Sequence, residues 1–132
     1  GSGSFGIECL SRGAKKIYFV ENYKNTLNIL KKNISALDLK NTSEIIEKNT
    51  YEILRDDFNN DKIDLIFLDP PFKDKNINKL LKKIKELKIA QKFTLIIIHR
   101  NKKFKENFID EFKIIREKTY GLSKIIFGKI LL

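Results

Sequence analysis

A strand that runs into two consecutive prolines is the feature that most constrains this chain. Residues 63–68 form an apolar run in which Asp64 is the only charged residue, and Asp69-Pro-Pro-Phe72 follows. The run is short and rich in Ile, Leu and Phe, which predicts a buried parallel strand. Proline donates no backbone hydrogen bond and disfavours helix in the residue before it, so the strand must end at or near Asp69.

The residues after this strand are a candidate site, because ligands of open α/β sheets bind at the carboxyl ends of the strands. An acid, stiff backbone carbonyls and an aromatic ring come together there. The alternative is a proline-terminated strand whose Phe72 belongs to the core.

The rest of the chain alternates helix and strand patterns, which predicts one α/β domain over residues 1–132 with a mostly parallel sheet and an antiparallel end. We expect a glycine-rich loop leading into a short helix closed by Gly13, and then strands and helices in alternation. The expected strands are 16–20, 44–48, 63–69, 93–98, 112–118 and 124–132, and the expected helices are 22–37, 49–54, 76–87 and, weakly, 103–109. Residues 55–62 are expected to form a charged surface loop.

A strand normally precedes a glycine-rich loop of this kind. Here none does, and we expect that strand to belong centrally, between those ending at Glu21 and Asp69. The chain is therefore expected to be a piece of a longer protein.

A nucleoside site is predicted near the start of the chain. Gly1, Gly3 and Gly6 match G-x-G-x-x-G, and the strand that follows ends at Glu21. An acid in that place can accept hydrogen bonds from both ribose hydroxyls. The leading Gly-Ser-Gly-Ser is also typical of a cloning linker, and a strand-end Glu can simply be solvated. Asn49, at another strand end, can bond an adenine or cap the next helix.

Composition narrows the class of partner. The net charge of +10 favours a polyanion such as nucleic acid. The excess of Lys over Arg is equally typical of a codon-biased proteome. Cys9 is the only cysteine, expected to be a small buried hydrophobe, and there is a single His. A His/Cys metal site and an intramolecular disulfide are therefore not expected, and a reducing cytoplasm fits. No apolar run approaches the ~18 residues that span a bilayer.

Taken together, segments from the whole length of the chain closely resemble the RsmD family of bacterial 16S rRNA guanine-N2 methyltransferases, which use S-adenosylmethionine. The segments are Gly1–Glu8, Leu10–Ala14, Val20-Glu21, Asp69–Phe72 and Arg116–Gly121. The resemblance implies a Rossmann-like class I methyltransferase sheet whose first strand is missing here. It also implies 16S rRNA or an assembling small ribosomal subunit as the partner of a cytoplasmic, monomeric enzyme without metal.

The resemblance assigns residues to two sites. The implied cofactor residues are Gly1, Ser2, Gly3, Glu21, Asn22, Asn49, Thr50 and Asp69. The implied catalytic residues are Asp69, Pro70 and Phe72, and the implied target-base residues are Pro71, Phe72, Lys73 and Tyr120. His99 and Arg100, which follow the strand 93–98, depart from the acidic residue that the resemblance implies there. Contact with substrate is one alternative for them, but at a strand end we expect them to be solvated.

The chemistry of Asp69-Pro-Pro-Phe72 suits an exocyclic amine, whose lone pair is conjugated into the base. Acceptors at the Asp69 carboxylate and the Pro70 carbonyl favour a geometry in which the lone pair leaves the ring plane, while Phe72 stacks on an unstacked base. The same motif fits adenine-N6 of DNA and the amide of glutamine. A nicotinamide-dependent dehydrogenase fits the glycines and Glu21 but leaves residues 69–72 unexplained. A further alternative is an inactive RNA-binding fragment.

Overall fold

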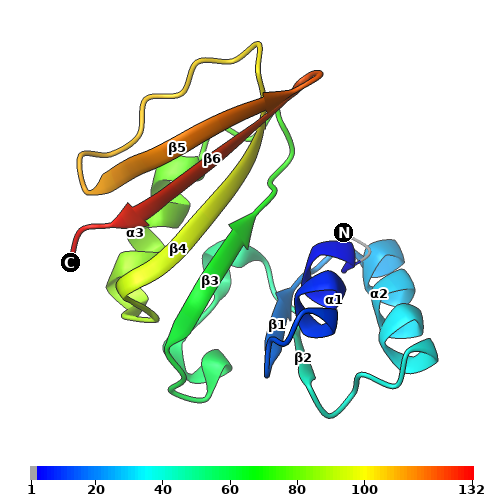
Figure 1. Ribbon diagram of the computed structural model, residues 1–132. Coiled ribbons are helices and arrows are strands. Elements are labelled where there is room, and N and C mark those ends of the chain that lie inside the picture. Colours follow the sequence, from blue (N-terminus) through cyan, green and yellow to red (C-terminus); the bar gives the residue numbers. More distant parts are fainter. Residues whose placement is uncertain (1–2) are drawn as a thin grey trace. The chain divides into compact units, whose positions relative to one another are not determined.

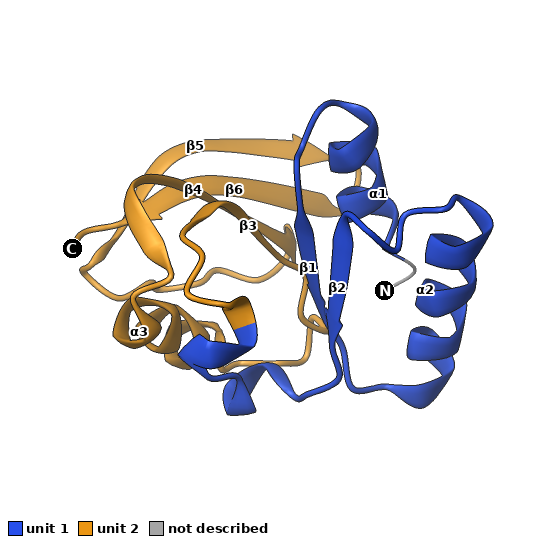
Figure 2. Cartoon of the chain, turned by 90° about the horizontal axis from the view of Figure 1, so that it is seen from below, with its two compact units in different colours: residues 1–57 blue, residues 58–132 orange. Residues whose placement is uncertain are grey.

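The computed structural model describes residues 3–132, and Gly1 and Ser2, which the sequence places in the glycine-rich loop, lie outside the described residues. The chain has the α/β organisation that the sequence predicts (Figure 1). It divides into two compact units, unit 1 over residues 1–57 and unit 2 over residues 58–132 (Figure 2). The expected alternation of helices and strands is present in unit 1 and, in unit 2, as far as residue 101.

Unit 1 is a small parallel sheet with two helices. Its elements are α1 (Ser4–Ser11), β1 (Ile17–Val20), α2 (Lys24–Ala36), β2 (Ser43–Ile46) and the 3-10 helix η1 (Thr50–Glu52). β1 and β2 pair in parallel, with Ile17 opposite Ser43 and Val20 opposite Ile46. The buried side chains of α2 recur at three- and four-residue spacing, as a helix with one apolar face requires. They are Leu27, Leu30 and Ile34.

Packing explains the glycines at the start of unit 1. A Cβ on Gly6 would lie 2.4 Å from Cε1 and 2.7 Å from Cζ of Phe19, and one on Gly3 would lie 2.4 Å from Cδ1 of Leu30. Gly3 also has a φ of +85°, a left-handed conformation that glycine adopts readily. Gly6 therefore lets α1 approach β1 closely, and Gly3 lets the chain turn into α1 against α2.

A side chain at position 6 is expected to destabilise the protein. We expect Gly6→Val to lower the free energy of unfolding by about 1–3 kcal/mol, because the new atoms overlap the Phe19 ring. Urea denaturation measures this loss. Phe19→Leu removes the crowded ring atoms, so the double variant should lose less than the sum of the single variants. A strictly additive double variant would contradict the close packing.

Unit 2 is a four-stranded sheet with order β3-β4-β6-β5. Its elements are β3 (Ile63–Leu68), α3 (Ile77–Leu87), β4 (Ala90–Asn101), β5 (Phe112–Tyr120) and β6 (Ser123–Ile130), and a second 3-10 helix, η2 (Arg55–Phe58), lies at the boundary of the units. β3 and β4 are parallel, while β6 is antiparallel to both β4 and β5. The predicted antiparallel end of the sheet, formed by the last two strands, is confirmed.

The core of unit 2 lies between α3 and the sheet. The helix buries Ile77, Leu80, Leu81 and Ile84, and α3 lies along one face of the strands (Figure 1). In β4, Ile96, Ile97 and Ile98 are all buried. Successive strand residues point to opposite faces, so this central strand is covered on both, as its continuous apolar run predicts.

Several local predictions are wrong. Residues 103–109 form turns and irregular backbone instead of a weak helix, and residues 55–58 of the expected charged loop form η2 with a buried Phe58. β3 is half exposed rather than buried, with Leu65 at 38% exposure, because within residues 3–132 β4 is its only paired neighbour. Cys9 is partly exposed because no residue of the short helix α1 is fully buried.

In the part of the chain that the structure describes, every helix falls short of the length and apolar character that crossing a membrane requires.

Candidate active site

In unit 1 the cofactor residues predicted at the strand ends share one edge of the sheet. β1 and β2 are parallel, so Glu21 and Asn22 after β1 and Asn49 and Thr50 after β2 lie at the same edge. The Glu21 N–H donates to the carbonyl of Ile46 at 3.1 Å, which joins the two strand ends directly. The parallel pairing of β1 and β2 therefore places these four predicted cofactor residues at the same end of the two strands.

The carboxylate of Glu21 is held by local backbone. Its Oε2 accepts hydrogen bonds from the N–H groups of Asn22 (3.0 Å) and Tyr23 (3.2 Å). Partial burial alone would raise the pKa of Glu21, but N–H donors stabilise the charged form, and the pKa lies below its ordinary value. Glu21 is consequently an ionised acceptor at neutral pH.

Asn49 performs the capping role that its sequence position allows. Its Oδ1 accepts a hydrogen bond from the Tyr51 N–H at 2.9 Å, at the start of η1. The Nδ2 of Asn49 has no hydrogen bond within residues 3–132. The capping alternative is confirmed, while a contact of Asn49 with an adenine stays a prediction.

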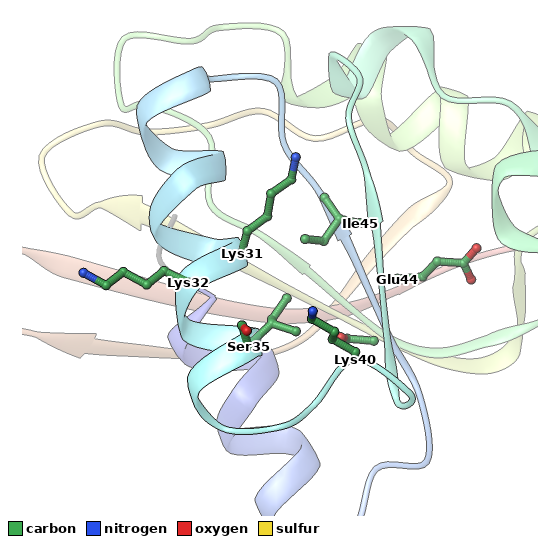
Figure 3. Close-up of a pocket in the computed structure, with 8 residues that line it drawn as sticks. Lys31, Lys32, Ser35, Lys40, Glu44 and Ile45 are labelled. Carbon is green, nitrogen blue, oxygen red and sulfur yellow. The ribbon is translucent and has the colours of Figure 1, made fainter.

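A shallow pocket in unit 1 lies away from these residues. It is lined from α2 and from the start of β2, and Figure 3 shows Lys31 and Lys32 on the helix and Glu44 and Ile45 on the strand. Ser43 and Glu44 begin β2, whereas Asn49 follows its end. The pocket therefore belongs to the opposite end of the strand from the predicted nucleoside residues.

In unit 2 the proline loop (residues 69–75) follows β3, and the side chains of Asp69 and Phe72 in this loop are exposed to solvent. The Asp69 side chain is 52% exposed and Phe72 is 40% exposed. Phe72 is therefore not a core residue, which removes the purely structural interpretation of the motif. Pro71 and Lys73 are also exposed.

Arg100 holds the backbone of the proline loop. Its Nη1 donates to the carbonyls of Pro71 (3.2 Å) and, at 3.5 Å, Pro70, and its Nη2 donates to those of Asp74 (2.7 Å) and Phe72 (3.4 Å). Its Nε donates to Oε1 of Glu106. The forked guanidinium suits this task because it presents several donors in one plane.

The Arg100–Glu106 pair is buried, with side chains only 4% and 10% exposed. The prediction that His99 and Arg100 are solvated at a strand end is thus wrong for Arg100. β4 continues to Asn101, because β6 pairs with it from Ile96 as far as that residue. Arg100 therefore lies within the strand and not beyond it.

His99 holds the side chain of Asp69. Its Nδ1 lies 2.8 Å from Oδ1 of Asp69, and its Nε2 lies 2.8 Å from Oγ of Ser123 at the start of β6. The Phe72 ring meets the His99 ring edge to face, with centroids 5.5 Å apart. His99 is thus in contact with both functional side chains of the proline loop, and its own side chain is only 23% exposed.

Tyr120 joins the same end of the sheet. It lies opposite Ser123 in the β5–β6 pairing and is 58% exposed. The carboxyl ends of β3, β4 and β5 share this edge of unit 2, as their arrowheads in Figure 1 show. The predicted substrate residues of unit 2 therefore cluster at one edge.

Sequence reasoning gave no role to Glu106 and Ser123, and it favoured a solvated His99 and Arg100 over a contact with substrate. No group of three or more His, Cys, Asp or Glu side chains within residues 3–132 is arranged to hold a metal ion. The cluster is organised by hydrogen bonds and one buried ion pair.

The known proteins that this chain is similar to include proteins named as methyltransferases. A family model described as conserved hypothetical protein 95 matches residues 1–129. The ribosomal RNA small subunit methyltransferase D of Haemophilus influenzae is 32% identical over 123 residues, which cover 92% of this chain and 64% of that protein. The protein of the same name from Buchnera aphidicola is 38% identical over 103 residues, 78% of this chain and 53% of its own.

A solved structure supports the fold. A Haemophilus influenzae protein of known crystal structure is 29% identical and superposes with a TM-score of 0.80 over 100% of this chain and 83% of that one. The chain spans less than two thirds of the length of the two curated relatives described above. Its fold is the Rossmann-like class I methyltransferase fold, with parallel strands and an antiparallel end. The chain belongs to the conserved hypothetical protein 95 family, the RsmD family that its motifs resemble.

Proposed function

We propose that this protein transfers a methyl group from S-adenosylmethionine to the exocyclic N2 amine of a guanine in 16S rRNA. The proposal rests on the geometry of the proline loop. His99 is hydrogen-bonded to the Asp69 carboxylate, and Arg100 donates hydrogen bonds to the carbonyls of Pro70 and Pro71. Membership of the RsmD family and the names of the curated relatives support the substrate class.

The proline loop supplies the acceptors that this chemistry needs. An exocyclic amine is a weak nucleophile while its lone pair is conjugated with the base. The Asp69 carboxylate and the Pro70 carbonyl accept its two protons and favour the geometry in which the lone pair points out of the ring plane. The Pro70 carbonyl keeps capacity for this, since a carbonyl has two lone pairs and the bond from Arg100 is long at 3.5 Å. Alignment of this kind is the enzyme's main contribution to such a reaction.

The exposed aromatic side chains complete the target-base site. We infer that Phe72 stacks on the unstacked base, an interaction worth about 1–3 kcal/mol per base. Pro71 forms the floor beside it, and Lys73 and Tyr120 contact the adjoining nucleotides. The net charge of +10 favours a ribosomal RNA, free or in an assembling small subunit, as partner. We propose that the enzyme is a monomer and acts in the cytoplasm.

Unit 1 carries residues that fit the cofactor. Glu21 is an ionised acceptor suited to a ribose diol, and the amide of Asn49 can donate to an adenine ring nitrogen. Gly1, Ser2 and Gly3 would line the methionine and ribose part, and Asn22 and Thr50 follow Glu21 and Asn49 in the chain. The family resemblance also assigns Asp69, which belongs to unit 2, to the cofactor. When bound, S-adenosylmethionine supplies an electrophilic methyl group on a sulfonium, so no covalent enzyme intermediate is needed.

Cofactor binding tests this proposal. We expect Glu21→Gln to weaken S-adenosylmethionine binding about 10–100-fold in isothermal calorimetry of the full-length protein, because hydrogen bonds to a charged acceptor are lost.

Glu47→Gln is the matched control, since Glu47 is an exposed acid just after β2 that pairs with Lys31. It should leave the affinity unchanged. Binding of NADH without binding of S-adenosylmethionine by the wild type would refute the proposal.

A further inference from the structure

We propose that His99 is a positioning residue that orients the Asp69 carboxylate toward the target amine, and that Ser123 selects the imidazole tautomer that does so. This inference deepens the proposed function and rests on it. It concerns His99 and Ser123, to which the sequence assigned no catalytic role and which the structure places in one hydrogen-bonded row with Asp69.

The hydrogen-bonded row links the exposed side chain of Asp69 to His99, a residue of the paired strand β4. His99 lies in β4, which is paired on both sides by β3 and β6, and its side chain is 23% exposed. Asp69 lies outside the sheet and its side chain is 52% exposed. Within residues 3–132, the His99 ring is the one hydrogen-bond partner of the Asp69 carboxylate. The partly buried ring therefore determines where the more exposed carboxylate points.

The partners at the two ring nitrogens determine the tautomer. An ionised carboxylate only accepts, so the Nδ1 of His99 must carry the proton that it donates to Oδ1 of Asp69. In the neutral ring Nε2 is then an acceptor, and the Ser123 hydroxyl donates to it at 2.8 Å. All donors in the row point toward Asp69. Its Oδ1 is occupied, and its Oδ2 is left to accept from the amine.

The same three residue types form the nucleophilic triad of serine hydrolases, and the order of exposure distinguishes the two roles. A hydrolase triad buries the acid and presents the serine to its substrate. Here Asp69 is exposed, whereas Ser123 is partly buried and lies in a strand between β4 and β5. The group that is presented to a substrate is therefore the Asp69 carboxylate and not the Ser123 hydroxyl.

Steady-state methyl transfer to 16S rRNA by the full-length protein tests this role. We expect His99→Leu to lower kcat about 10–100-fold, the effect of a lost hydrogen bond to a charged group, with the KM for S-adenosylmethionine unchanged. His99→Asn places an amide N–H where Nδ1 lies, so its kcat should exceed that of His99→Leu at least about threefold. Ser123→Ala should lower kcat less than His99→Leu.

The background of Asp69→Ala separates positioning from a general structural effect. If His99 acts through Asp69, adding His99→Leu to Asp69→Ala should cause no further loss of kcat. Thermal unfolding of each variant shows whether the fold is kept. Equal kcat for wild type and His99→Leu, or equal losses in His99→Leu and His99→Asn that add to the loss from Asp69→Ala, would overturn the inference. A wild type that methylates no RNA would instead overturn the proposed function.

Discussion

Replacing Asp69 by alanine is expected to lower kcat for methyl transfer to RNA about 100-fold or more. The carboxylate is exposed, held by His99 and placed beside the Pro70 and Pro71 carbonyls, so its loss removes an acceptor that aligns the reacting amine. Asp69→Asn keeps one carbonyl oxygen and should retain an intermediate rate. Single-turnover kinetics with labelled S-adenosylmethionine measure the effect on the chemical step.

Asp64→Ala is the matched control for this experiment. Asp64 is an exposed acid of β3, five residues before Asp69, and it accepts a hydrogen bond from Gln91 at 3.3 Å. Its loss should leave kcat near the wild-type value. Methylation by Asp69→Ala at the wild-type rate would refute the role of the carboxylate.

Replacing Arg100 by methionine is expected to lower the free energy of unfolding by about 3–5 kcal/mol, the usual result of removing one partner of a buried ion pair. The change leaves the Glu106 carboxylate buried without its cation, and Oε2 of Glu106 already has no hydrogen-bond partner within residues 3–132. It also removes the hydrogen bonds that the guanidinium donates to the carbonyls of Pro71 and Asp74. Guanidinium denaturation measures the loss.

A double variant identifies the cause. Arg100→Met with Glu106→Met removes both charges and should be more stable than Arg100→Met alone. Arg100→Lys should not restore stability, since an ammonium cannot bond several carbonyls in a planar fork. An Arg100→Met protein as stable as the wild type would show that the proline loop does not depend on this residue.

The sequence was sufficient to predict most helices and strands, because their apolar periodicities are local. The spacing of Leu27, Leu30 and Ile34 predicts α2, and the apolar run before His99 predicts the central strand. The prolines predict the end of β3 to within a residue. The weak apolar pattern over 103–109 predicts a helix that the structure does not contain. Glu106 in that segment forms an ion pair with Arg100, and helical periodicity does not reveal such a contact.

The candidate site was predictable only in part, for a physical reason. Asp69, Phe72 and Glu21 are distinctive residue types at strand ends, where ligands bind. Arg100, by contrast, bonds backbone carbonyls of residues 70–74, between 26 and 30 positions away, and carbonyls carry no residue-type information. The one available clue was chemical: a histidine, an arginine and, six residues on, a glutamate follow the nearly continuous apolar run of residues 93–98.

The most direct test of the account is the identity of the methylated nucleoside. The full-length protein would be incubated with S-adenosylmethionine and unmethylated small-subunit RNA, and the RNA digested to nucleosides for mass spectrometry. The account predicts N2-methylguanosine, formed by the wild type and reduced about 100-fold or more with Asp69→Ala. A methyl group found only in parallel incubations, on adenine-N6 of DNA or on a protein glutamine, or on no acceptor while the cofactor binds, would contradict it.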